Sequence, residues 1–113
     1  MKRILLVCAV ALLASCGKYG SGTFSIKNEY DEDLSIVTVV QYDEAGSNLG
    51  KKTINGVPAN STSGRTEFVY GTDKIKVTAH VTGKLWIIES SLIKLKPIGN
   101  TVLVVANGTI KVK

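Results

Sequence analysis

Residues 101–113 read Thr-Val-Leu-Val-Val-Ala-Asn-Gly-Thr-Ile-Lys-Val-Lys, and this stretch decides the fold class. Asn107-Gly108 stands between two runs of β-branched residues, which is the strongest short signal for a β-hairpin. The sequence therefore predicts two antiparallel strands, 101–106 and 109–112, joined by a two-residue turn.

The apolar pattern of these two strands agrees with that turn. A two-residue connection places Val105 opposite Ile110 and Leu103 opposite Val112. Side chains alternate between the two faces of a strand, so these four apolar side chains share one face of the hairpin. That shared face is expected to cover a core.

A second hairpin is predicted around Thr82-Gly83, because apolar residues alternate along the segment before it. A two-residue turn at this point sets Ala79 opposite Trp86. It also sets Lys76 opposite Glu89 on the outer face, as a cross-strand ion pair. Thr-Gly is a weaker turn signal than Asn-Gly, so this register is less strongly determined than the first.

Short β-branched runs separated by Gly, Asn, Asp and Pro recur throughout the chain after residue 22. The run 34–42 is the longest and most apolar, which indicates a central strand. Loops or bends are expected at 43–48, 55–64 and 92–97. The complete set of expected strands is 23–28, 34–42, 49–54, 66–70, 74–81, 84–91, 101–106 and 109–112.

Seven or eight short strands in residues 23–113 predict one all-β domain. The chain has 113 residues, of which 44% are apolar and 20% are charged, so it suits one modest core and is too apolar for a disordered chain. The spacing of the turns favours a small antiparallel β-sandwich, immunoglobulin-like or transthyretin-like. A small β-barrel is the alternative.

The first residues have the pattern of an export signal. Lys2 and Arg3 precede the apolar run 4–14, which is shorter than the roughly 20 residues that a membrane-spanning helix needs. A basic start followed by such a run is typical of a secretory signal peptide. The run closes with Leu13-Ala14-Ser15-Cys16, which resembles the lipobox of bacterial lipoproteins.

The resemblance to bacterial lipoproteins covers residues 1–16 and implies a lipid anchor. In that class the chain is cut before the cysteine, so residues 1–15 would be removed and Cys16 would carry diacylglycerol and an acyl chain such as palmitate. Residues 16–22 would then be a flexible tether. Gly17 follows the cysteine in place of the aspartate that retains enterobacterial lipoproteins in the inner membrane, which implies the outer membrane.

Cleavage changes the charge and the cysteine count. The net charge of +5 becomes +3 without Lys2 and Arg3. Cys8 would be removed and Cys16 would carry lipid, so no disulfide is expected within the domain. Export makes nucleic acid an improbable partner, and the expected contacts are the membrane and another protein of the cell envelope.

Two clusters of charge are candidate binding sites. The first is the acidic segment formed by Glu29, Asp31, Glu32 and Asp33, which is a candidate contact for a protein partner or Ca²⁺. It lacks the residue spacing of an EF-hand, and a solvated turn is the alternative interpretation. The second cluster is a group of lysines near the end of the sequence: Lys94, Lys96, Lys111 and Lys113. These lysines could face anionic headgroups or glycan phosphates, or they could protect strand edges.

No pattern of catalytic residues is present in the sequence. His80 is the single histidine and falls on the polar face of its predicted strand, where a solvated side chain is expected. The chain has no Gly-x-Ser-x-Gly motif and no phosphate-binding loop. We therefore expect neither an enzyme nor a metal site, and no cofactor other than the covalent lipid.

These observations predict a membrane-anchored lipoprotein of the cell envelope that serves as a non-catalytic binding or structural module. The alternative is an inhibitor of a lytic enzyme such as lysozyme, which would bind through the acidic loop. Small lipoproteins that inhibit lysozyme are similar in size and β content. They commonly carry a disulfide, which is not expected in this chain.

Overall fold

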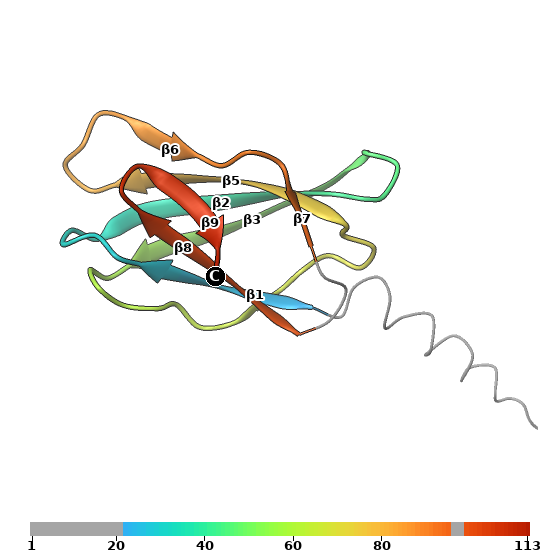
Figure 1. Ribbon diagram of the computed structural model, residues 1–113, viewed down its shortest axis with the longest axis horizontal. Coiled ribbons are helices and arrows are strands. Elements are labelled where there is room, and N and C mark those ends of the chain that lie inside the picture. Colours follow the sequence, from blue (N-terminus) through green and yellow to red (C-terminus); the bar gives the residue numbers. More distant parts are fainter. Residues whose placement is uncertain (1–21, 96–98) are drawn as a thin grey trace, which may run out of the picture.

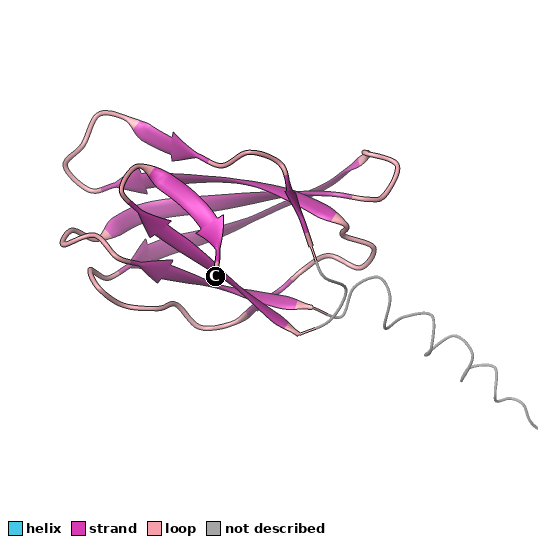
Figure 2. Ribbon diagram, viewed as in Figure 1, coloured by secondary structure: helices cyan, strands magenta, loops and turns pink. Residues whose placement is uncertain are grey.

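The computed structural model describes residues 22–95 and 99–113, and in these ranges it consists of strands and loops (Figures 1 and 2). The predicted signal peptide, Cys16 and Lys96 lie outside the described residues. Within them, no helix is long and apolar enough to cross a membrane. The strands are β1 Thr23–Asn28, β2 Leu34–Tyr42, β3 Asn48–Val57, β4 Thr66–Glu67, β5 Lys74–Val81, β6 Ile87–Glu89, β7 Ile93–Lys94, β8 Asn100–Ala106 and β9 Thr109–Val112.

The strands form two sheets that pack face to face. One sheet has the order β4-β1-β8-β9, and the other has the order β3-β2-β5-β6, with β7 also paired to β5. The two sheets remain separate, so the β-sandwich prediction is confirmed and the closed barrel is wrong. The core between them is almost entirely aliphatic, with one aromatic pair in which the rings of Phe24 and Phe68 lie 5.0 Å apart.

One pairing departs from the antiparallel prediction, because β1 and β8 are parallel, with Thr23 beside Asn100 and Asn28 beside Val105. A hairpin turn forces antiparallel pairing only between strands that are close in sequence. The second sheet lies between β1 and β8 along the chain, and it supplies the long crossover that a parallel pair needs.

The Asn-Gly hairpin has the predicted register. Val105 pairs with Ile110 and Leu103 with Val112. Asn107 and Gly108 both have positive φ, 51° and 75°, as the favoured two-residue hairpin turn requires. The bounds of β1, β2, β5 and β9 agree with the prediction, and β2 is central, between β3 and β5.

The register predicted for the Thr82-Gly83 hairpin is wrong by two residues. Ala79 pairs with Ile88, and Glu89 lies opposite Thr78, so the predicted Lys76–Glu89 pair does not form. The turn closes by the Lys84 N–H donating to the Val81 carbonyl, and it has positive φ only at Gly83. Such a turn splays the flanking strands, so pairing resumes only at Ile87.

Other boundaries also differ from the prediction. β3 continues to Val57, where Pro58 ends it, although residues 55–57 were expected in a loop. Only Thr66–Glu67 of the expected strand 66–70 pairs with β1. The expected strand 84–91 is reduced to β6, and the expected bend 92–97 contains the two-residue strand β7.

The sandwich has two ends with different loops. We call the end where β1 begins at Thr23 the proximal end, because the chain enters the domain there (Figure 1, right). The loop 43–47 and the start of β5 at Lys74 also lie at this end. The opposite end, the distal end, carries the turns that follow β1, β3, β5 and β8 (Figure 1, left).

Candidate functional site

The predicted acidic segment is the loop between β1 and β2 at the distal end. Glu29 forms an ion pair with Lys27 at 3.4 Å, and Glu32 forms one with Lys84 at 3.6 Å. Asp31 and Asp33 are exposed, and within the described residues neither is paired with a cation. Their Oδ1 atoms accept hydrogen bonds from the side-chain amide of Asn60 and the backbone N–H of Ala59, respectively.

The buried side chain of Asn28 and the half-buried side chain of Tyr30 hold this loop to its neighbours. Asn28 is 1% exposed, and its Nδ2 donates to the backbone carbonyls of Glu32, Val57 and Pro58, while its Oδ1 accepts from the N–H of Tyr30. The Tyr30 hydroxyl accepts a hydrogen bond from the Gly108 N–H in the last hairpin turn. The distal loops are therefore fixed relative to one another before any partner binds.

The loop between β5 and β6 joins the same surface. The N–H of Thr82 donates to the backbone carbonyl of Asp33 at 2.9 Å. This loop and the first residue of β6 present three consecutive apolar side chains to solvent, with Leu85 fully exposed, Ile87 60% exposed and Trp86 47% exposed. The sequence prediction missed this surface, because a paired strand was expected here. The signal was the unbroken apolar run 85–88, which alternation does not explain.

A fourth exposed apolar side chain, Ile36, lies on the outer face of the same sheet. Ile36 pairs with His80, and His80 pairs with Ile87, so these three residues form one row across β2, β5 and β6. Ile36 is 42% exposed. We refer to Ile36, Leu85, Trp86 and Ile87 as the apolar patch.

His80 supports the patch through its ring and is not the freely solvated side chain that was predicted. The His80 Nε2 lies 2.7 Å from the carbonyl oxygen of Lys84, which can only accept, so Nε2–H is the donor. Nδ1 lies 2.6 Å from Oγ of Ser35. The imidazole therefore bridges β2 and the β5–β6 loop.

The predicted lysine group is only partly brought together. Lys94 and Lys113 line one cleft of about 280 Å³ with Leu95, Val102 and Val112. Lys111 is exposed on β9 opposite Val104, which places it on the other face of the hairpin from the core.

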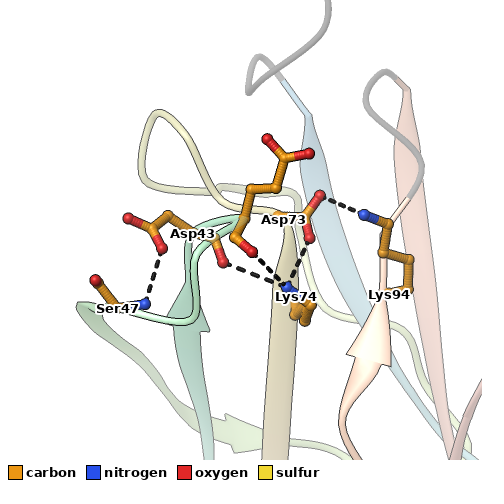
Figure 3. A network of polar contacts seen from close by, with 6 residues as sticks. Asp43, Ser47, Asp73, Lys74 and Lys94 are labelled. Carbon is orange, nitrogen blue, oxygen red and sulfur yellow. Dashed lines mark hydrogen bonds and ion pairs between the residues drawn. The ribbon is translucent and has the colours of Figure 1, made fainter.

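Lys94 is also engaged in a network at the proximal end (Figure 3). Its Nζ lies 2.6 Å from Oδ1 of Asp73, and Nζ of Lys74 lies 3.0 Å from Oδ2. The same Lys74 ammonium donates to the backbone carbonyl of Glu44 at 3.1 Å. The hydrogen bond from Lys94, helped by Lys74, lowers the pKa of Asp73 below its ordinary value, although burial opposes that shift.

The described residues hold no group of three or more His, Cys, Asp or Glu side chains placed to bind a metal ion. In the acidic loop, each carboxylate is directed to its own partner. The role of this loop as a protein contact or a Ca²⁺ ligand stays a prediction.

No protein family matches the chain by sequence, and no curated protein does so. Its fold is similar to that of a protein from Eubacterium rectale solved by NMR, with a TM-score of 0.59 and 13% identity over 86% of this chain and 89% of that one. It is also similar to Lip of Serratia marcescens, a membrane-bound component of the type VI secretion system. That match has a TM-score of 0.55 and 10% identity over 83% of this chain and 97% of Lip.

These two likenesses concern the fold alone, and they show that the chain has the fold of a small β-sandwich domain. The chain covers nearly the whole length of both solved proteins, so the likeness concerns complete domains.

Proposed function

We propose that this protein is a lipid-anchored module of the cell envelope, held to a membrane through Cys16, that binds another envelope protein without catalysis. The observation that carries the proposal is the lipobox Leu13-Ala14-Ser15-Cys16 directly before a domain whose fold also occurs in a membrane-bound protein. One acyl chain anchors only marginally, whereas the two or more chains on a lipoprotein cysteine hold stably.

The geometry is compatible with an anchor at one end and a binding surface at the other. β1 begins at the proximal end, where the Thr23 N–H donates to the Gly99 carbonyl, and the tether predicted at 16–22 leads to this strand in the sequence. The distal loops are cross-connected by Asn28 and Tyr30. A surface that is rigid before binding loses less entropy on association, which favours a recognition role.

The anchor is tested by intact mass and detergent partitioning of the protein from its native membrane. We expect a product that begins at Cys16, carries diacylglycerol and enters the detergent phase. Cys16→Ser should leave the chain without lipid. Cys8→Ser is the matched control, because Cys8 lies in the segment expected to be removed, and it should leave the lipidated product unchanged. An unmodified wild-type protein in the aqueous phase would refute the anchor.

The destination is tested by one substitution after the cysteine. We propose the outer membrane because Gly17 follows Cys16. In an enterobacterial host, Gly17→Asp should move the protein to the inner-membrane fraction of a density gradient. Gly17→Ser is the control and should not move it. Wild-type protein found in the inner membrane would contradict this assignment.

A second candidate function is inhibition of a lytic enzyme, which the exposed carboxylates of Asp31 and Asp33 favour. A cationic lysozyme would be attracted to these groups. The test is lysis of cell walls by a cationic lysozyme with and without the protein. Asp31→Asn with Asp33→Asn should abolish any protection, and no protection by the wild-type protein would exclude this function.

A further inference from the structure

We propose that the apolar patch and the carboxylates of Asp31 and Asp33 form one docking surface for a protein segment in which an apolar anchor is flanked by lysine or arginine. This inference deepens the proposed function and rests on its binding role. It assigns the surface and the chemistry of the partner.

The apolar half of the surface groups four exposed apolar side chains, those of Ile36, Leu85, Trp86 and Ile87, at one end of the sheet. Single exposed apolar side chains are common on soluble proteins, but contiguous patches mark interaction sites. Leu85 has no cover, and Trp86 and Ile87 follow it directly in the chain. Ile36 and Ile87 flank His80 in one row across the sheet. Tryptophan is among the residues that most often dominate binding energy.

The polar half of the surface is negatively charged. Of the four carboxylates in the β1–β2 loop, those of Glu29 and Glu32 are paired with lysines, and those of Asp31 and Asp33 form no ion pair with any residue that the structure describes. The whole chain is basic, with a net charge of +5, so this acidic end is a local exception. A cationic partner gains from two exposed carboxylates beside an apolar contact, because complementary charge steers and orients association.

The two halves belong to one rigid unit. The hydrogen bond from the Thr82 N–H to the Asp33 carbonyl joins the loop of the patch to the acidic loop. The ion pair between Lys84 and Glu32 joins the same two loops one residue before Leu85. The Nε2–H of His80 donates to the backbone carbonyl of Lys84 and so holds the backbone of the loop at that residue. The spacing between apolar anchor and charge is therefore set by the fold.

Two other occupants fit less well. An anionic bilayer would be repelled by Asp31 and Asp33, and the surface lies at the end opposite to the tether. A second copy of this chain, docked patch to patch about a two-fold axis, would bring the same carboxylates toward each other. A basic segment of another protein satisfies both the apolar and the acidic half.

The binding chemistry can be measured with the intrinsic fluorescence of Trp86, which is the single tryptophan in the chain. The full chain in zwitterionic vesicles is titrated with a synthetic Leu/Lys peptide and with its Leu/Glu counterpart. We expect a blue shift and saturable binding with the lysine peptide only, weakened by salt. Equal binding of both peptides, or none, would overturn the proposal. Because the surface is distant from the tether, Cys16→Ser protein should bind equally, which separates this result from a failure of the anchor.

Variants then assign the binding to the surface. Leu85→Ser should weaken binding at least about tenfold, as loss of a central anchor does. Leu92→Ser is the matched control, since Leu92 is 55% exposed at the opposite end, and it should bind as the wild type does. Asp31→Asn with Asp33→Asn keeps both Oδ1 acceptors and should remove the salt dependence. Equal loss in the Leu85 and Leu92 variants would refute the assignment.

The natural partner is tested by photocross-linking in the native cell, with p-benzoylphenylalanine in place of Leu85 or, as the control, Leu92. We expect an adduct to a second polypeptide from position 85 only, through a peptide rich in lysine or arginine, and lost in the Asp31→Asn, Asp33→Asn background. An adduct to lipid, an adduct to a second copy of the chain, or an adduct insensitive to the loss of both carboxylates would contradict the proposal.

Discussion

Asn28 determines the geometry of the distal end with a single side-chain amide. Its Nδ2 faces three backbone carbonyls and its Oδ1 accepts from Tyr30, all with the side chain buried. Leaving buried polar groups unsatisfied costs about 1–3 kcal/mol. Sequence pattern could not predict this role, because the partners come from two loops whose approach depends on how β3 leaves its sheet.

Asn28→Ala should therefore lower the free energy of unfolding by about 2 kcal/mol, measured by urea denaturation. Asn48→Ala is the control. Asn48 is exposed, and its Oδ1 accepts a local hydrogen bond from Gly50 at 2.7 Å, so we expect a change within about 0.5 kcal/mol. Equal losses in the two variants would show that Asn28 does not organise the distal loops.

Asp73 gives the proximal end a dependence on pH. The Lys94 and Lys74 ammonium groups lower the pKa of Asp73 in the folded state. Its carboxylate therefore contributes stability above the unfolded pKa of about 3.9, and loses that contribution as the pH falls through the lower folded value. Asp73→Asn should be less stable than the wild type by about 1 kcal/mol at neutral pH, and the difference should disappear in acid.

Urea midpoints at neutral pH and at acidic pH, for the wild type and Asp73→Asn, measure this effect. Lys94→Met removes the partner that lowers the pKa of Asp73 most. It should reproduce much of the loss, and the double variant should lose less than the sum of the two single variants, because they share one interaction. A difference between wild type and Asp73→Asn that is constant with pH would contradict the ion-pair account.

At the scale of elements, the long and regular strands were predictable and the connections were not. β2 and β5 have clear apolar patterns, and the last hairpin has the Asn-Gly turn that its register needs. The Thr82-Gly83 turn misled the prediction because it has one positive φ instead of two. Pairing with β5 resumes only at Ile87, after Leu85 and Trp86, so the docking surface arises where local pattern and tertiary structure disagree.

The candidate site could be predicted only in part, because its charges are visible in the sequence whereas the exposure of its apolar residues depends on the tertiary structure. The acidic residues Asp31 and Asp33 stand out as charge in any sequence. Outside this site, Gln41 shows the same limit: it is fully buried on the central strand, and its Oε1 accepts from the Val69 N–H at 2.7 Å. Only the structure shows that a polar residue is needed there to satisfy a loop.

β3 is an edge strand of ten residues, and it carries features that oppose association with other strands. Lys52 pairs with Val39, whose side chain is buried, so this lysine lies on the core-facing side of the sheet edge. Inward-pointing charges on edge strands prevent edge-to-edge pairing. Gly56, with φ of 81°, further disturbs the edge.

Lys52→Val should therefore promote association, seen by sedimentation velocity as species larger than the monomer that increase with protein concentration. Thr38→Val is the control, because it replaces a hydroxyl by a methyl group on the central strand β2, which is paired on both sides. It should sediment as the wild type does. A Lys52→Val protein that remains monomeric at all concentrations would show that the edge is protected by other means.

At the scale of the whole molecule, the anchor and the charges should orient the domain on a bilayer. A strand of eight residues such as β5 spans about 26 Å, so the distal loops lie roughly that far beyond the proximal ones. The anchor is proposed at the proximal end, and the distal end carries the exposed carboxylates of Asp31 and Asp33, which form no ion pair with a described residue. Anionic lipids repel these carboxylates, so the distal end should point away from the bilayer.

A fluorophore attached through Leu92→Cys should therefore be quenched severalfold more by nickel-chelating lipids than one attached through Leu85→Cys, when the lipidated chain is placed in anionic vesicles. The difference should shrink in high salt, because screening weakens the orienting force while the lipid retains the protein. Asp31→Asn with Asp33→Asn should shrink it at low salt as well. Equal quenching at both positions in low salt would mean that the domain lies flat, with the apolar patch against the bilayer and unavailable to a protein partner.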